Sequence, residues 1–305
     1  KLTAVISELK EETKARFLKN WKMYSYEILG RKQEYYDDMY FMRNFIFANI
    51  KLKNLNSLDV VKKTIESMGF NYNKIKVDDK DRKGKYPSPF CSGINIPNDV
   101  RVSFKAENPI NDLNSIHHEF GHAIHFISID KNSPYWKRYL SSTGLCETFS
   151  TFLEDFIQNK TYLTEEAKID ENNAEEIVAR LKFIRDYATM FYCANSLFRI
   201  DYWEKKLSFE ECNETYAKKI KECMNISMPG AYWQLHHILP ESLMYVPSYL
   251  LAMIRADELR KQIVKLYGEV FWRSKSAGDY LKSFMKPGAK SKLGTFSNLG
   301  NAFNQ

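Results

Sequence analysis

The stretch "SIHHEFGHAIHF" (residues 115–126) gathers four of the six histidines of this 305-residue chain, with one glutamate among them. Within it, "HEFGH" (residues 118–122) places two histidines four positions apart. On an α-helix this spacing puts both imidazoles on one face, about 40° from each other, so both can reach a single ion. Zn²⁺ is well suited to imidazole nitrogens. Glu119 is turned away by about 100° and could reach a water molecule on that ion. The alternative is a polar helix face that is rich in histidine by coincidence.

A third ligand is predicted 25 residues after His122, at Glu147 in "GLCETFSTFLEDF". The spacing of apolar residues in this segment indicates an amphipathic helix. A carboxylate among apolar neighbours is costly unless it has a partner, and a metal ion would provide one. Two histidines and a glutamate leave a fourth position open for water, which is the pattern of a catalytic zinc site with one ion per chain.

The other two histidines, His236 and His237, stand together, and Tyr245 and Tyr249 follow them. Histidine and tyrosine side chains are suitable donors to a tetrahedral oxyanion. The alternative is a buried histidine pair beside two packing tyrosines.

The elements that would position these residues are mostly helical. Periodicity predicts two helices within residues 1–50, the second over 34–50, and a helix over 57–69 with Ser57 as N-cap. Residues 70–105 predict a small sheet with an edge strand at 100–105. Further helices are predicted over 111–128, 144–158, 173–199, 208–225 and 247–273. The metal-binding helix would begin at Asn111 or Asp112 as N-cap.

Composition agrees with a mainly α fold with a small β-sheet (α+β). Hydrophobic residues make up 44% and charged residues 27% of the chain, as in ordinary globular proteins. We expect one domain over residues 1–305, with a helical N-terminal part (1–70), the sheet (71–110), a helical zinc-binding core (111–290) and a tail (291–305).

The net charge of +7 is spread over interspersed Lys and Glu, without a nucleic-acid recognition motif, so we expect no nucleic-acid partner. No signal peptide and no apolar run of about 18 residues is visible, so no membrane partner is expected. Five dispersed cysteines indicate a reduced, cytoplasmic protein. Because the chain begins at Lys1 and not at Met, we expect residues to be missing before it.

With these residues in place, the chain resembles the M3 family of zinc peptidases, the thimet oligopeptidase and oligoendopeptidase F group. The signature HExGHxxH is met by His118, Glu119, Gly121, His122 and His125, and the third ligand of the family matches Glu147. The segments "DRKGKYPSPFCSG", "ETFSTFLE" and "MKPGAKSK" are also similar to the family, so the likeness runs from about residue 75 to 290. Two features depart from it. Members are commonly about twice as long, and "HHILPESLMYVPSY" lacks the glycine of the family's loop, which leaves two candidate histidines.

The resemblance implies a zincin-type catalytic domain that hydrolyses peptide bonds in short peptides as an endopeptidase. Zn²⁺ would be held by His118, His122 and Glu147, with Glu119 as general base. Oxyanion donors would be His237 and Tyr245, or else His236 and Tyr249. The strand near 100–105 would bind the substrate backbone along its edge.

The resemblance also implies supporting roles. His125 would lie behind the ligands or line a channel, and Gly121 would allow close packing at the site. A missing N-terminal region or a second chain would complete the cleft.

Two other functions remain open. One is a zinc carboxypeptidase with the same ligand set, of the M32 type or the angiotensin-converting enzyme type. Such an exopeptidase needs a group that captures the terminal carboxylate of the substrate. The other is a zinc-binding module without catalytic activity.

Overall fold

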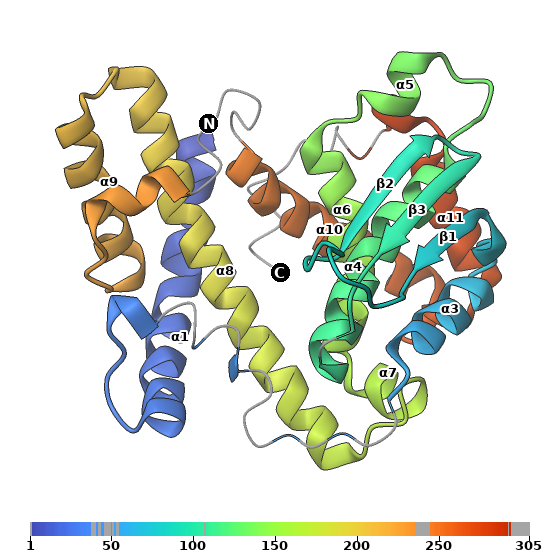
Figure 1. The fold of residues 1–305 in the computed structure, drawn as a ribbon, viewed down its shortest axis with the longest axis horizontal. Coiled ribbons are helices and arrows are strands. Elements are labelled where there is room, and N and C mark those ends of the chain that lie inside the picture. The colour runs from blue at the N-terminus through green and yellow to red at the C-terminus, as the bar shows by residue number, and fades with distance from the viewer. Residues whose placement is uncertain are drawn as a thin grey trace. The chain divides into compact units, whose positions relative to one another are not determined.

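The computed structural model describes residues 2–37, 41, 44, 45, 50, 52, 55–106, 108–235, 245–291 and 293. The chain forms two compact units (Figure 1). Unit 1 comprises Lys1–Ile50, Glu176–Leu250 and Leu299–Gln305, and unit 2 comprises Lys51–Glu175 and Leu251–Asn298. Since such a division does not test the single domain expected from the sequence, that expectation stays a prediction.

Unit 1 is helical. Its described elements are α1 (Leu2–Leu29), most of α8 (Glu171–Lys205), α9 (Phe209–Met224), the start of α10 (Tyr245–Tyr267) and two short 3-10 helices, Tyr35–Asp37 and Gly230–Leu235. Its core is strongly aromatic, with rings from α1 and α8 in mutual contact: Phe17, Trp21, Tyr24, Phe183 and Tyr187. A bidentate ion pair from Arg16 to Asp186, at 2.6 and 2.7 Å, joins the same two helices.

Unit 2 combines a sheet with several helices. Its helices are α3 (Ser57–Ser67), α4 (Pro109–Ser128), α5 (Tyr135–Tyr139), α6 (Thr143–Glu154), α7 (Lys160–Glu165), the rest of α10, and α11 (Lys275–Met285). Short 3-10 helices cover Tyr72–Lys74, Asp155–Gln158, Phe271–Arg273 and Gly288–Lys290. Helix α4 lies at the centre, in contact with the sheet, with α3 and with α6 (Figure 1).

The sheet has three strands in the order β1 (Ile75–Asp78), β3 (Asp99–Ser103), β2 (Phe90–Asn95). Strand β3 pairs parallel with β1 and antiparallel with β2. The predicted edge strand at 100–105 is therefore the central strand, and that prediction was wrong. Alternation of buried and exposed residues shows which face of a strand packs on the core, but it does not show how many neighbours the strand has.

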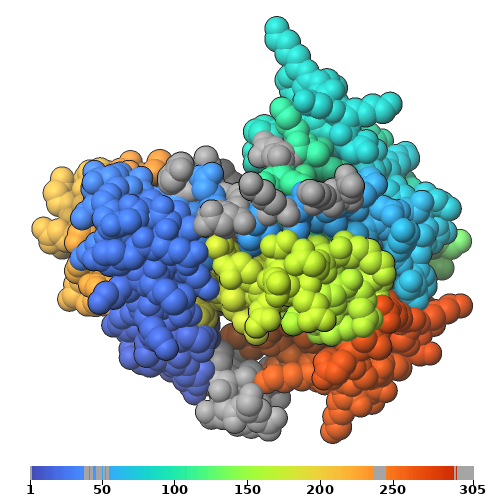
Figure 2. Space-filling view, turned by 90° about the horizontal axis from the view of Figure 1, so that it is seen from below, coloured from blue at the N-terminus to red at the C-terminus, as the bar shows by residue number. Residues whose placement is uncertain are grey.

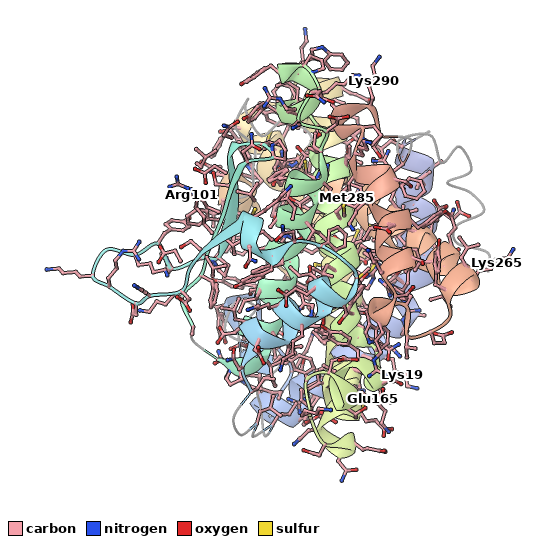
Figure 3. All side chains as sticks on the ribbon, turned by 90° about the vertical axis from the view of Figure 1, so that its right-hand side faces the viewer. Lys19, Arg101, Glu165, Lys265, Met285 and Lys290 are labelled. Atoms are coloured by element: carbon pink, nitrogen blue, oxygen red, sulfur yellow. The ribbon has the colours of Figure 1, made fainter. Side chains whose placement is uncertain are left out.

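The two faces of the sheet differ in burial. Val100 and Val102 are fully buried, whereas Arg101 projects from β3 to the surface (Figure 3). The loop between β1 and β2, which carries Lys80, Arg82, Lys83 and Lys85, stands out from unit 2 as the cyan projection in Figure 2.

Most predicted helices are found, with corrected beginnings. Asn108 caps α4 by accepting a hydrogen bond from the Ile110 N–H at 3.0 Å, so the predicted caps Asn111 and Asp112 were wrong. Pro109 occupies the first helical position, where no N–H is needed. Asn56, not Ser57, caps α3 in the same way.

The mainly α fold with a small sheet is confirmed. The short helices α5, α7 and α11 were not predicted. Most of the helix predicted over 34–50 falls outside the described residues. Within the described part of the chain, no helix is both long and apolar enough to span a membrane.

Candidate metal centre

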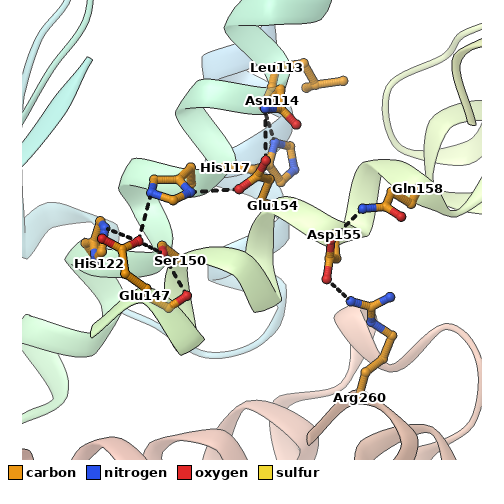
Figure 4. A network of polar contacts seen from close by, with 11 residues as sticks. Leu113, Asn114, His117, His122, Glu147, Ser150, Glu154, Asp155, Gln158 and Arg260 are labelled. Atoms are coloured by element: carbon orange, nitrogen blue, oxygen red, sulfur yellow. Dashed lines mark hydrogen bonds and ion pairs between the residues drawn. The ribbon is translucent and has the colours of Figure 1, made fainter. Parts of the chain in front are cut away.

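Helices α4 and α6 bring three potential metal ligands together. His118 Nε2 lies 3.4 Å and His122 Nε2 lies 3.6 Å from the same carboxylate oxygen, Oε2 of Glu147 (Figure 4). Their ligand atoms all lie within 4.8 Å of one another. The three residues singled out by type and spacing are therefore neighbours in space.

Close approach of the two helices depends on Gly121. A Cβ at this position would lie 2.5 Å from the Ser150 Cα and would also collide with the Phe149 carbonyl oxygen. The backbone of α6 can therefore lie directly against α4 between the two histidines. The apolar residues of α4, of α6 and of the 3-10 helix that follows α6 are buried: Leu113, Ile116, Phe120, Ala123 and Ile127, and Leu145, Phe149, Phe152, Leu153 and Phe156.

Glu147 is nearly enclosed, with 4% of its surface exposed. Its Oε2 accepts a hydrogen bond from the Ser150 hydroxyl at 3.0 Å. Burial raises the pKa of Glu147, but its hydrogen bond with His118 and the nearby charges of His122 and His118 outweigh burial, so the pKa falls to about 2. This carboxylate is therefore ionised at neutral pH, as a metal ligand must be.

Glu154, which sequence reasoning missed, orients the first histidine. Its Oε2 lies 2.7 Å from His118 Nδ1, and its Oε1 accepts a hydrogen bond from Asn114 Nδ2 at 3.1 Å (Figure 4). A proton held on Nδ1 leaves the lone pair of Nε2 directed at Glu147 and any shared ion. Glu154 follows Glu147 by seven residues, two helical turns on the same face, and that spacing was the available signal.

The carboxylates of Glu147 and Glu154 favour the protonated form of His118. Burial lowers the pKa of this imidazole, but hydrogen bonds to Glu147 and Glu154 raise it more, so the pKa lies above its ordinary value. A cation between His118 and Glu147 would displace the proton, because metal binding releases protons from its ligands.

Glu119, the predicted general base, lies beside the cluster. The backbone N–H of Cys91 on β2 favours the charged form of this carboxyl group. Burial raises the pKa of Glu119, the charge of His118 lowers it, and the charge of Glu147 raises it further; the net direction is upward. A carboxylate whose pKa is raised accepts a proton more readily than an ordinary carboxylate, which suits a general base.

The other two histidines of α4 face the interior of unit 2. His125 is fully buried against the Phe149 ring, at 4.6 Å between centroids, so it does not line a solvent channel. Its ring nitrogens have no hydrogen-bond partner among the described residues. His117 lies between the Leu113 carbonyl oxygen and the Tyr162 hydroxyl, at 2.6 and 2.7 Å.

The predicted oxyanion donors are only partly described. His236 and His237 lie outside the described residues. Tyr245 and Tyr249 lie in the first turns of α10, in unit 1, with their rings 5.3 Å apart, and Tyr249 stacks on Tyr192 at 5.0 Å. Their role at an oxyanion stays a prediction.

The donor set fits zinc. Ligands at about 2.1 Å from an ion in a tetrahedral arrangement lie roughly 3.4 Å apart. The 3.4 and 3.6 Å separations between the histidine nitrogens and the Glu147 oxygen agree with that value. Two imidazole nitrogens and one carboxylate oxygen also leave a fourth coordination position for solvent or substrate.

Several solved structures that share this fold at low sequence identity have peptidase or carboxypeptidase in their names. "PZ peptidase A with inhibitor 2" matches at TM-score 0.68 and 16% identity, over 99% of this chain and 54% of that one. A "putative oligoendopeptidase F" from Bacillus anthracis str. Ames matches at TM-score 0.60 and 15% identity, over 99% and 52%. The "M32 carboxypeptidase" from Deinococcus radiodurans R1 matches at TM-score 0.60 and 12% identity, over 98% and 67%. The chain thus spans about half the length of the first two.

No curated protein sequence matches the chain. A model of the family described as "Carboxypeptidase Taq (M32) metallopeptidase" matches residues 41–285, which is most of the chain and includes the whole ligand cluster. Membership of the M3 family, expected from the sequence, is not confirmed. The chain belongs to the M32 family of metallopeptidases.

Proposed function

We propose that this chain is a zinc-dependent metallocarboxypeptidase that removes residues from the C-terminus of short peptides, with one zinc ion per chain. The observation that carries the proposal is the cluster of His118, His122 and Glu147 in a chain whose family is described by carboxypeptidase activity. The endopeptidase activity expected from the sequence is less well supported, since the oligoendopeptidase-like structures share only the fold at this identity.

A zinc ion in this cluster would polarise the scissile carbonyl and lower the pKa of a water molecule. Glu119 takes a proton from the attacking water molecule while the water oxygen forms its bond to the carbonyl carbon. The same carboxyl group then gives the proton to the leaving nitrogen as the C–N bond breaks. The products are a shortened peptide with a new terminal carboxyl group and the released C-terminal residue with a free amino group.

Two contacts prepare these side chains for their roles. The Cys91 N–H favours the charged form of the Glu119 carboxyl group. Glu154, held by Asn114, fixes the orientation of the His118 ring. Both contacts exist before substrate arrives, so little reorganisation is needed when it binds. Tyr245 with His237, or Tyr249 with His236, are proposed to donate to the oxyanion.

The decisive experiment compares one peptide with a free C-terminus and the same peptide amidated, each incubated with zinc-loaded protein and analysed by mass spectrometry. We expect stepwise loss of C-terminal residues from the free peptide alone, abolished by a chelator and restored by zinc.

Internal cleavage of both peptides at equal rates would show an endopeptidase. Zinc binding without cleavage of either would instead favour the non-catalytic module and sink the proposal.

A further inference from the structure

Unit 1 contains a cavity of about 290 Å³ that no part of the proposed peptidase function uses. The cavity lies beside α1 and is also lined by the residues that directly follow α1 and those that directly follow α9. Its lining consists of Leu18, Trp21, Lys22, Ser25, Tyr26, Lys32, Gln33, Asn225 and Ile226. This volume is near the lower end for small-molecule sites and would hold about ten water molecules at ~30 Å³ each.

The charges around this cavity have one sign. Lys22 and Lys32 are both exposed, and no carboxylate occurs among the described residues of the lining. Neither ammonium forms an ion pair with any residue that the structure describes, whereas the neighbouring Arg31 is neutralised by Asp37 at 2.6 Å. Two unpaired cations at a recess with low-dielectric walls create a positive potential that attracts an anion.

The walls of the cavity suit an apolar group. Leu18, Trp21 and Ile226 supply hydrophobic surface, and Trp21 and Ile226 are almost fully buried. The Ser25 hydroxyl is already committed to the Trp21 carbonyl oxygen at 2.6 Å.

From these observations we infer that the cavity binds a small organic carboxylate, with its charged end at Lys22 and Lys32 and its apolar end against Trp21 and Ile226. A free amino acid fits less well, because the described part of the lining offers no carboxylate to pair with an ammonium group. This inference does not depend on the peptidase function.

Calorimetric titration with three probes of matched shape tests the charge requirement: 3-phenylpropionate, 3-phenylpropan-1-ol and 3-phenylpropylamine. We expect the acid to bind, the alcohol to bind at least about tenfold more weakly, and the amine not to bind, since charge-assisted contacts are stronger than neutral ones.

Variants then locate the site. The double variant Lys22→Gln/Lys32→Gln should weaken binding of the acid by about tenfold or more. A matched control, Lys19→Gln/Lys182→Gln, removes two exposed lysines of unit 1 that lie outside the cavity and should leave binding unchanged (Lys19 is labelled in Figure 3). Equal affinities for acid and alcohol, equal effects of the two double variants, or no binding of the acid would each overturn the inference. If the acid bound at the metal centre and not in the cavity, both double variants would bind it as the parent protein does, so the variants distinguish the two sites.

Discussion

The metal centre depends on a carboxylate that does not itself touch the predicted ion. Glu154 contacts the far nitrogen of His118, and a carboxylate in this position fixes the ring and raises its basicity toward a metal. Such a partner is hard to predict from sequence, because its role depends on which atoms of another helix it reaches.

Replacing Glu154 with Gln should lower zinc affinity by about 10- to 100-fold without unfolding unit 2, because the amide can still accept the hydrogen bond but carries no charge. Competition with a chromophoric chelator measures the affinity. Glu269→Gln, at an exposed glutamate of unit 2 outside the ligand cluster, is the matched control. Equal zinc affinity in Glu154→Gln and the parent would show that the contact does not tune the ligand.

Glu119 is expected to behave in the opposite way. Glu119→Gln should bind zinc as the parent does, since its carboxylate is not among the three clustered ligands, yet lose about 10²- to 10⁴-fold in peptide hydrolysis because the proton acceptor is gone. Initial rates and zinc content measured on one preparation separate the two properties. Turnover at the parent rate would remove Glu119 from its role as general base.

At the scale of helices and strands, the local sequence pattern predicted where helices lie, but it did not predict which strands pair with one another. The helical period of residues 111–128 and 144–158 predicted α4 and α6 within a few residues, and the ligand spacing then predicted their meeting. The place of β3 in the centre of its sheet was missed because strand order depends on distant segments. The cap at Asn108 was missed because "AENPINDLN" offers several asparagines, although Pro109 marks the helix start.

The contact between α4 and α6 predicts that a glycine-to-alanine substitution lowers the free energy of unfolding, the reverse of its usual effect in a helix. Gly→Ala inside a helix ordinarily stabilises by up to about 1 kcal/mol. Gly121→Ala should instead destabilise by about 1–3 kcal/mol, because its methyl group would meet the backbone of Phe149 and Ser150. Urea unfolding of the metal-free protein measures the change, and zinc affinity should fall with it as His118 and His122 move away from Glu147. An increase in stability would mean that the helices do not touch at this point.

At the scale of the whole molecule, the sequence predicted a zincin-type metallopeptidase fold, whereas the M3 family that it resembled is not confirmed and the matching family model is that of the M32 metallopeptidases. The HExxH motif and a glutamate on the following helix serve endopeptidases and carboxypeptidases alike, since both need the same ion and the same base. The groups that distinguish the two activities are those that meet the end of the substrate. No motif in this sequence identifies such a group, and His236 and His237 lie outside the described residues.

Stability of the whole chain should fall in acid because of a histidine that is buried uncharged. Burial lowers the pKa of His125 to about 3, from an ordinary value of 6.5. Above pH 6.5 neither the folded nor the unfolded state protonates this ring. As the pH falls from 6.5 toward 3, the unfolded state binds a proton that the folded state does not, which costs about 1.4 kcal/mol per pH unit. In His125→Phe, which keeps an aromatic ring against Phe149, the unfolding free energy of the metal-free protein should therefore decline less steeply between about pH 6 and pH 4. Urea titrations at several pH values give both slopes, and identical slopes would mean that this ring takes up its proton without unfolding.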